Sequence, residues 1–93
     1  MMISIIIPNY NGFRTLRRCL EAVKSSSYQE YECIVVDDGS TDGSIELARD
    51  LASQVVTVED GPKGPGHARN LGAQAAIGEI LFFVDADVLV YPD

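Results

Sequence analysis

The stretch Glu32-Cys33-Ile34-Val35-Val36-Asp37 is almost continuously apolar and ends in a carboxylate. A run of this kind is typical of a strand that is buried on both faces, as in the centre of a parallel sheet. Residues 38–43 follow with turn formers and several candidates for a helix N-cap, and helical spacing continues from there to Ala52. The stretch therefore predicts a βα unit with polar side chains at the carboxyl end of its strand.

The same alternation extends over the whole chain. A β-branched strand is predicted over residues 3–7, and Pro8 is expected to end it because proline cannot donate to a central ladder. The remaining predicted elements are a helix over 14–26, a strand over 55–58, a loop over 60–66, a helix over 67–76 and a strand over 80–85. This order requires right-handed crossovers. It predicts an α/β, Rossmann-like fold: a mainly parallel four-stranded sheet with helices on both faces.

Composition disfavours several classes of function. The 93 residues make one domain at most, and an apolar fraction of 46% is typical of a globular chain. A net charge of -7 argues against nucleic acid as a partner, because such binding needs clustered cations. Cys19 and Cys33 lack metal-type spacing and are interpreted as core residues. No secretory signal and no bilayer-length apolar run are present, so a cytoplasmic location is expected.

The first strand leads into Pro8-Asn9-Tyr10-Asn11-Gly12, where a dinucleotide-binding protein would carry a glycine-rich fingerprint. Its absence, and that of a phosphate-binding P-loop, disfavours nicotinamide or flavin oxidoreductases and P-loop nucleotidases. The segment is equally compatible with an Asn-capped turn and with a ligand site in which Tyr10 stacks on a base. The later Gly64-Pro65-Gly66 also fails the fingerprint, since Arg69 stands where a third glycine is needed.

Acidic and basic side chains follow the other strands. Asp37 and Asp38 point to opposite faces of an extended segment, so one can face a ligand while the other caps the turn. Arg69 lies one turn into a helix whose N-terminus favours anions. It is expected on the buried side of that helix and is a candidate for a diphosphate contact. His67 is interpreted as a helix-start residue, and Gly72 as a site of close helix packing.

Asp85-Ala86-Asp87 places two carboxylates on one side of a strand end. Like charges held this close repel unless a proton or a cation compensates them. Oxygen ligands favour Mg²⁺ or Mn²⁺, which also accept phosphate oxygens. The alternative interpretation is an exposed acidic turn. The strongly apolar strand before the pair favours the metal site.

Four segments together resemble the family 2 glycosyltransferases: 4–11 (Ser-Ile-Ile-Ile-Pro-Asn-Tyr-Asn), 34–42 (Ile-Val-Val-Asp-Asp-Gly-Ser-Thr-Asp), 66–72 (Gly-His-Ala-Arg-Asn-Leu-Gly) and 83–87 (Phe-Val-Asp-Ala-Asp). The resemblance implies a GT-A fold and transfer of a hexosyl group from a nucleotide diphosphate sugar, most simply a UDP-sugar, with inversion. It also implies one divalent cation and a setting in cell-envelope polysaccharide synthesis. It assigns Pro8 and Tyr10 to the base pocket, Asp38 to a uracil-type base, Arg69 to the base or diphosphate, Asp85 to the ribose or sugar, and Asp87 to the cation.

The family's general base lies well past the D-x-D triplet, whereas this chain ends at Asp93, six residues after it. The base is therefore expected after Asp93, and no catalytic residue is expected within the chain. Residues 1–93 are interpreted as the N-terminal, nucleotide-diphospho-sugar-binding half of an incomplete GT-A domain, inactive alone.

The parent enzyme is expected in the cytoplasm or at the cytoplasmic face of the membrane. Two alternatives stay open: a sugar-phosphate nucleotidyltransferase and a non-catalytic binding module. Exposed sheet edges also predict self-association.

Overall fold

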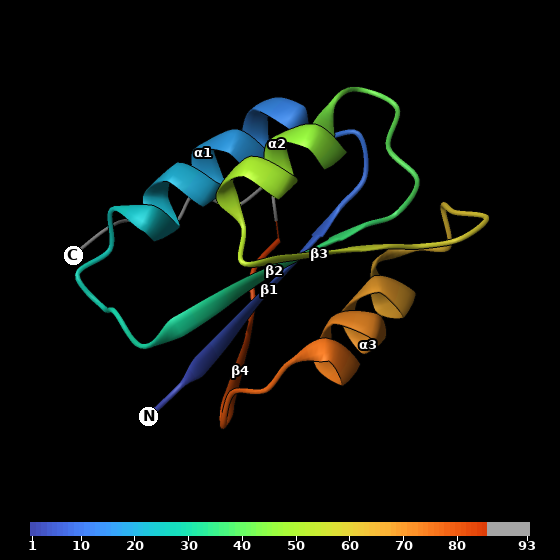
Figure 1. Cartoon of the computed structure of the whole chain (residues 1–93). Helices are drawn as coiled ribbons and strands as arrows, with labels where there is room; N and C mark the ends of the chain where they lie inside the picture. The colour runs from blue at the N-terminus through green and yellow to red at the C-terminus, as the bar shows by residue number, and fades with distance from the viewer. Residues whose placement is uncertain (86–93) are drawn as a thin grey trace.

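The computed structural model describes residues 1–85 of the chain. Strands and helices alternate strictly along this part (Figure 1): β1 (Ile3–Asn9), α1 (Phe13–Lys24), β2 (Tyr31–Asp37), α2 (Ser44–Leu51), β3 (Gln54–Thr57), α3 (Pro65–Ala75) and β4 (Ile80–Phe83). The predicted order of elements is confirmed. Helix α3 begins two residues earlier than predicted, because proline is well suited to the first helical position.

The sheet has the order β3-β2-β1-β4, and every neighbouring pair is parallel. The central pair, β1 and β2, runs in register from Ile3 opposite Tyr31 to Asn9 opposite Asp37. Both strands therefore end at the same level, and the turns that follow them lie side by side at the carboxyl edge. The predicted parallel α/β fold is confirmed.

The prediction that Pro8 ends the first strand is wrong, since β1 continues to Asn9. The Ile6 carbonyl accepts the amide of Val84 on the β4 side, whereas the Asn9 carbonyl accepts the amide of Asp38 on the β2 side. By strand alternation the nitrogen of Pro8 faces the β4 side, where the ladder with β1 has already ended at Ile6. The missing N–H of Pro8 therefore costs no ladder bond.

The helices cover both faces of the sheet. Figure 1 shows α1 and α2 together on one face and α3 on the other. Neighbouring residues of one strand enter different cores, because Ile7 packs with Leu16 of α1 and Ile6 with Ala68 of α3. The predicted two-sided covering is confirmed.

Both cysteines belong to the core beneath α1 and α2. Burial raises the pKa of the Cys19 thiol to about 11. Burial, with a smaller contribution from Cys19, raises the pKa of Cys33 to about 12. Both thiols therefore stay protonated at neutral pH and behave as small apolar side chains, as the sequence predicts.

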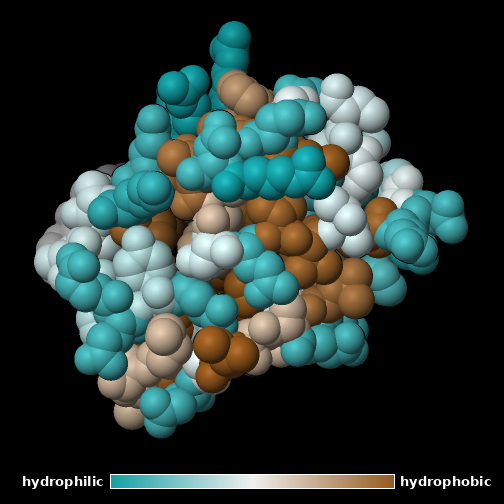
Figure 2. Space-filling model, in the orientation of Figure 1, coloured by the Kyte–Doolittle hydropathy of each residue, from teal (hydrophilic) through white to brown (hydrophobic). Residues whose placement is uncertain are grey.

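Strand β4 is the most exposed strand of the sheet within residues 1–85. Its four side chains, Ile80 to Phe83, keep between 41% and 55% of their surface exposed although all are apolar. On the side seen in Figure 2, apolar atoms also reach the surface between β3 and α3. None of the helices within residues 1–85 has the length and hydropathy of a membrane-spanning segment.

Gly72 lets α3 approach the sheet closely. A Cβ at this position would overlap the Cγ2 atom of Ile6 and would lie 3.1 Å from Cγ2 of Val36. Both contacted side chains are fully buried in β-strands and have no room to move aside. The close packing predicted for Gly72 is confirmed.

Gly72→Ala is expected to lower the free energy of unfolding by about 1–3 kcal/mol, the usual cost of overpacking a core. Chemical denaturation would measure this. Gly66→Ala is the matched control on the same helix, because a Cβ there meets nothing within 4 Å. An equal stability of the two variants would contradict the close packing of α3.

Candidate functional site

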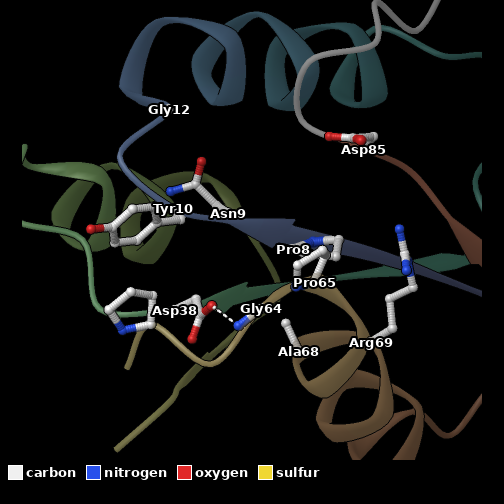
Figure 3. A pocket seen from close by; sticks show the side chains of 11 residues that line it. Pro8, Asn9, Tyr10, Gly12, Asp38, Gly64, Pro65, Ala68, Arg69 and Asp85 are labelled. Carbon is white, nitrogen blue, oxygen red and sulfur yellow. Dashed lines mark hydrogen bonds between the residues drawn. The ribbon is translucent and has the colours of Figure 1, made fainter. Parts of the chain in front are cut away.

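A pocket of about 310 Å³ opens at the carboxyl edge of the sheet. Its lining comes from the end of β1, the end of β2, the loop before α3, the first turns of α3 and the residues after β4. Five of the six predicted site residues line this pocket: Pro8, Tyr10, Asp38, Arg69 and Asp85 (Figure 3). The sixth, Asp87, lies outside the described residues. The chain thus brings together side chains that are up to 77 positions apart in the sequence, from Pro8 to Asp85.

Tyr10 forms the aromatic part of the pocket. It follows the last residue of β1, and 52% of its surface is exposed. In Figure 3 its ring lies on the same side of the pocket as Asp38. An exposed ring beside a polar pocket offers a flat surface on which a planar group can stack.

The two adjacent acids at the end of β2 have separate roles. Asp37 is fully buried, and its carboxylate accepts the Ser40 amide at 2.8 Å and the Asn9 side-chain amide at 3.2 Å. It caps the turn, as predicted for one member of the pair. Asp38 instead lines the pocket.

Asp38 is only 4% exposed, and both its oxygens accept hydrogen bonds from the loop before α3. The Lys63 amide donates to Oδ1 at 2.8 Å and to Oδ2 at 3.1 Å, and the Gly64 amide donates to Oδ2 at 2.8 Å. Helix N-terminal amides favour an anion. Here Asp38 supplies that charge for the amides just before α3, an arrangement that sequence reasoning missed.

Asn9 also lines the pocket and was not predicted as a site residue. Its Nδ2 atom donates to Asp37 and, at 3.3 Å, to the Ser40 hydroxyl. Ser40 in turn accepts the amide of Asn11 at 2.8 Å. These bonds join the turn after β1 to the turn after β2. The sequence of either turn alone could not predict these hydrogen bonds, because the partner of each one lies in the other turn.

Arg69 is exposed, which corrects the expectation that it faces the buried side of α3. The neighbouring Ala68 occupies the buried position instead, because one face of α3 packs on the sheet. In Figure 3 the Arg69 side chain rises from α3 toward the side of the pocket where Asp85 lies. Its cation therefore stands at the pocket rim, near where an anionic ligand would enter.

Residues 1–85 contain no group of three or more His, Cys, Asp or Glu side chains arranged to hold a metal ion. Asp85, the first acid of the predicted pair, does lie in the pocket lining. A carboxylate there has the oxygen chemistry that Mg²⁺ and Mn²⁺ prefer. The pocket therefore offers one oxygen ligand of the predicted kind, on the side toward which Arg69 rises.

A parallel sheet with a polar pocket at its carboxyl edge is the arrangement in which α/β proteins bind nucleotides. The sequence model of the glycosyl transferase family 2 matches residues 4–93. The chain belongs to this family, and the resemblance seen in its four motifs is confirmed.

Individual relatives support the same family assignment. The chain is 41% identical over 91 residues to the glycosyltransferase AglE of Haloferax volcanii, covering 91% of this chain and 30% of the relative. It is similar to the S. aureus TarS 1-349 structure in complex with UDP-GlcNAc, with a TM-score of 0.86, 33% identity and coverage of 98% and 28%. It is also similar to the mannosyltransferase PcManGT of Pyrobaculum calidifontis in complex with GDP-Man and Mn²⁺, with a TM-score of 0.81, 33% identity and coverage of 94% and 28%.

The chain thus spans under a third of the length of these relatives. Over the matched part it has the GT-A, Rossmann-like α/β fold of these solved structures.

None of the residues that line the pocket was predicted as the general base. The sequence predicts this base after Asp93, the last residue of the chain, and Asp93 itself lies outside the described residues, as Asp87 does. The position of the base after Asp93 stays a prediction.

Asp42 holds the start of α1 beside the pocket. Its carboxylate accepts the amide of Phe13 at 3.0 Å and both the amide and the hydroxyl of Ser44. Slight desolvation raises the pKa of Asp42, but the bonds from Ser44 and Phe13 outweigh this and leave the pKa below its usual value.

Asp42→Ala is expected to lower the free energy of unfolding at pH 7 by about 0.5–1 kcal/mol. This is the low end of the range for a helix-capping side chain, because solvent screens an exposed carboxylate. Since the pKa of Asp42 is lowered by folding, its contribution is complete above 3.8, the ordinary value, and is lost as the pH falls through the lowered pKa.

Urea denaturation at pH 7 and at pH 3 should therefore show the difference between Asp42→Ala and wild type shrinking in acid. Asp50→Ala, which removes an exposed acid of α2, is the control. A difference that does not change with pH would contradict this role.

Proposed function

We propose that the chain is the donor-binding part of an inverting glycosyltransferase that transfers a sugar from a nucleotide diphosphate sugar to an acceptor hydroxyl. The observation that carries the proposal is the gathering of Tyr10, Asp38 and Arg69 in one pocket at the carboxyl edge. Solved relatives in complex with UDP-GlcNAc and with GDP-Man support a donor of this chemical class. Membership of family 2 favours a transferase over the nucleotidyltransferase and the non-catalytic module.

The base binds in the part of the pocket between Tyr10 and Pro8. Stacking on the Tyr10 ring supplies affinity without selecting one base. Selectivity comes from Asp38. Its carboxylate offers about four acceptor positions, and three are used by Lys63 and Gly64. One position is left for the imide N–H of a uracil-type base, which makes a UDP-sugar the preferred donor.

The diphosphate lies toward Arg69, whose planar guanidinium can pair with phosphate oxygens. Asp85 approaches the ribose or the sugar, and Asp87 binds a divalent cation. A Mg²⁺ or Mn²⁺ ion held there would supply positive charge that balances the charge of the diphosphate leaving group. A solved relative in complex with GDP-Man and Mn²⁺ supports this cofactor. The general base that deprotonates the acceptor comes after Asp93, in the acceptor half of the protein.

The proposal has three further parts. The transferred sugar is a hexose, the acceptor belongs to a cell-envelope polysaccharide, and the protein is located in the cytoplasm. Residues 1–93 by themselves bind the donor and do not transfer sugar.

Tyr10→Ala is expected to weaken UDP binding by about 1–3 kcal/mol in calorimetric titration, the usual contribution of one stacked base. Tyr10→Phe keeps the ring and should bind nearly as wild type does. Equal binding by the alanine and phenylalanine variants would exclude stacking on this residue.

Mn²⁺ is expected to strengthen UDP binding, and Asp87→Ala should abolish that effect while a weak, metal-independent affinity for the base remains. Titrations with Mn²⁺ and with a chelator separate the two contributions. Asp50→Ala serves again as the control, since Asp50 does not line the pocket. A metal effect that survives in Asp87→Ala would refute the assignment of the cation to this residue.

We further propose that the chain self-associates through the unpaired outer edge of β4. Unpaired strand edges are templates for pairing, and the exposed Phe82 and Phe83 would gain burial. Sedimentation velocity should show a concentration-dependent dimer, and Phe82→Lys should shift it to monomer. A monomer at all concentrations would contradict self-association through β4.

A further inference from the structure

The loop between β3 and α3 rests directly on the turn after β2, backbone against backbone. A Cβ on Gly61 would lie 2.8 Å from the carbonyl oxygen of Asp38 and 2.9 Å from its carbonyl carbon. From the other side, a Cβ on Gly39 would lie 3.0 Å from the carbonyl carbon of Gly61. Main-chain atoms cannot move aside as a flexible side chain can. The contact therefore requires that Gly61 carry no side chain.

The carboxylate of Asp38 holds the same loop two residues further on. It accepts the amides of Lys63 and Gly64 within 3.1 Å and is almost completely buried. Hydrogen bonds to an ionised acceptor are stronger than those between neutral groups. The position just before α3 adds a favourable interaction with the helix dipole.

These contacts determine where one wall of the pocket stands. Pro62, Gly64 and Pro65 line the pocket, whereas Gly61 does not. In Figure 3 the bond between Asp38 and Gly64 spans the gap between the end of β2 and the start of α3. Gly61 thus lies outside the pocket and yet fixes the segment that forms its wall.

We propose that Gly61 and Asp38 are positioning residues. Together they hold the β3–α3 loop against the turn after β2, an arrangement called the lock below. The lock places Pro62, Gly64 and Pro65 as the wall on the base side of the pocket before nucleotide binds. Only the identity of the ligand rests on the proposed function. A wall that is already in place spares the ligand the entropy of ordering the loop, so the lock raises nucleotide affinity. Asp38 thereby has a role in the ligand-free protein, apart from any contact with a base.

The lock is tested first without nucleotide, by hydrogen exchange resolved to single amides. Asp38→Asn removes one acceptor oxygen and turns an NH₂ group toward the loop, so the Lys63 and Gly64 amides should exchange about tenfold faster or more. Gly61→Ala should accelerate the same two amides, because the added methyl pushes the loop from Asp38. Gly66→Ala, at a position where a Cβ meets nothing within 4 Å, should leave them unchanged. Unchanged exchange in Asp38→Asn and in Gly61→Ala would overturn the lock.

The consequence for binding is tested by calorimetry with UDP and with uridine monophosphate. Gly61→Ala should weaken both nucleotides by a similar factor, roughly tenfold, since the misplaced wall is on the base side. Gly66→Ala should bind both as wild type does. Binding by Gly61→Ala equal to that of Gly66→Ala would overturn the claim that the wall sets affinity. Thermal unfolding of each variant shows whether the fold is intact, and Asp38→Asn carries the exchange test if Gly61→Ala does not fold.

Failure of the proposed function gives a different pattern. Wild-type protein would then bind neither nucleotide, while the exchange of the Lys63 and Gly64 amides would still decide whether the lock exists.

Discussion

The parallel ladder between β1 and β2 is the constraint on which the carboxyl edge depends. Its register pairs Asn9 with Asp37 as the last residues of the two strands, so Tyr10 and Asp38 leave the sheet side by side. A shift of one residue would exchange the faces of Ile6 and Ile7 and bury the wrong side chains. The two cores therefore fix the register, and the register fixes the pocket.

Buried polar groups then determine how the turns are arranged. Asp37 has no contact with solvent, and such a carboxylate is tolerated only when hydrogen bonds replace its water. The Ser40 amide and the Asn9 side chain supply them. Asp38 is satisfied in the same way by the loop before α3. The adjacent acids thus tie β2 to two different segments, one on each side, and the pocket lies between those segments.

Most of this architecture could be predicted from sequence, because it depends on local patterns. Buried strands ending in polar turns predicted the parallel sheet, and the rule that ligands bind at strand carboxyl ends predicted Tyr10 and Asp38 as neighbours. The partners of Asp38 could not be predicted, since they lie 25 and 26 residues later in a loop without periodicity. The exposure of Arg69 depends on which face of α3 meets the sheet, and the weak amphipathicity of that helix left this open. The extension of β1 through Pro8 depends on where β4 stops.

The central claim is that a nucleotide binds at the carboxyl edge between β1, β2 and α3. Backbone amide resonances followed during a titration with UDP and Mg²⁺ test it most directly. The account predicts shifts confined to Tyr10, Asp38, Gly64, Arg69 and the two acids Asp85 and Asp87. Shifts centred instead on the opposite edge, at Gln29, Glu32 and Ile77, or no shifts at millimolar UDP, would contradict it.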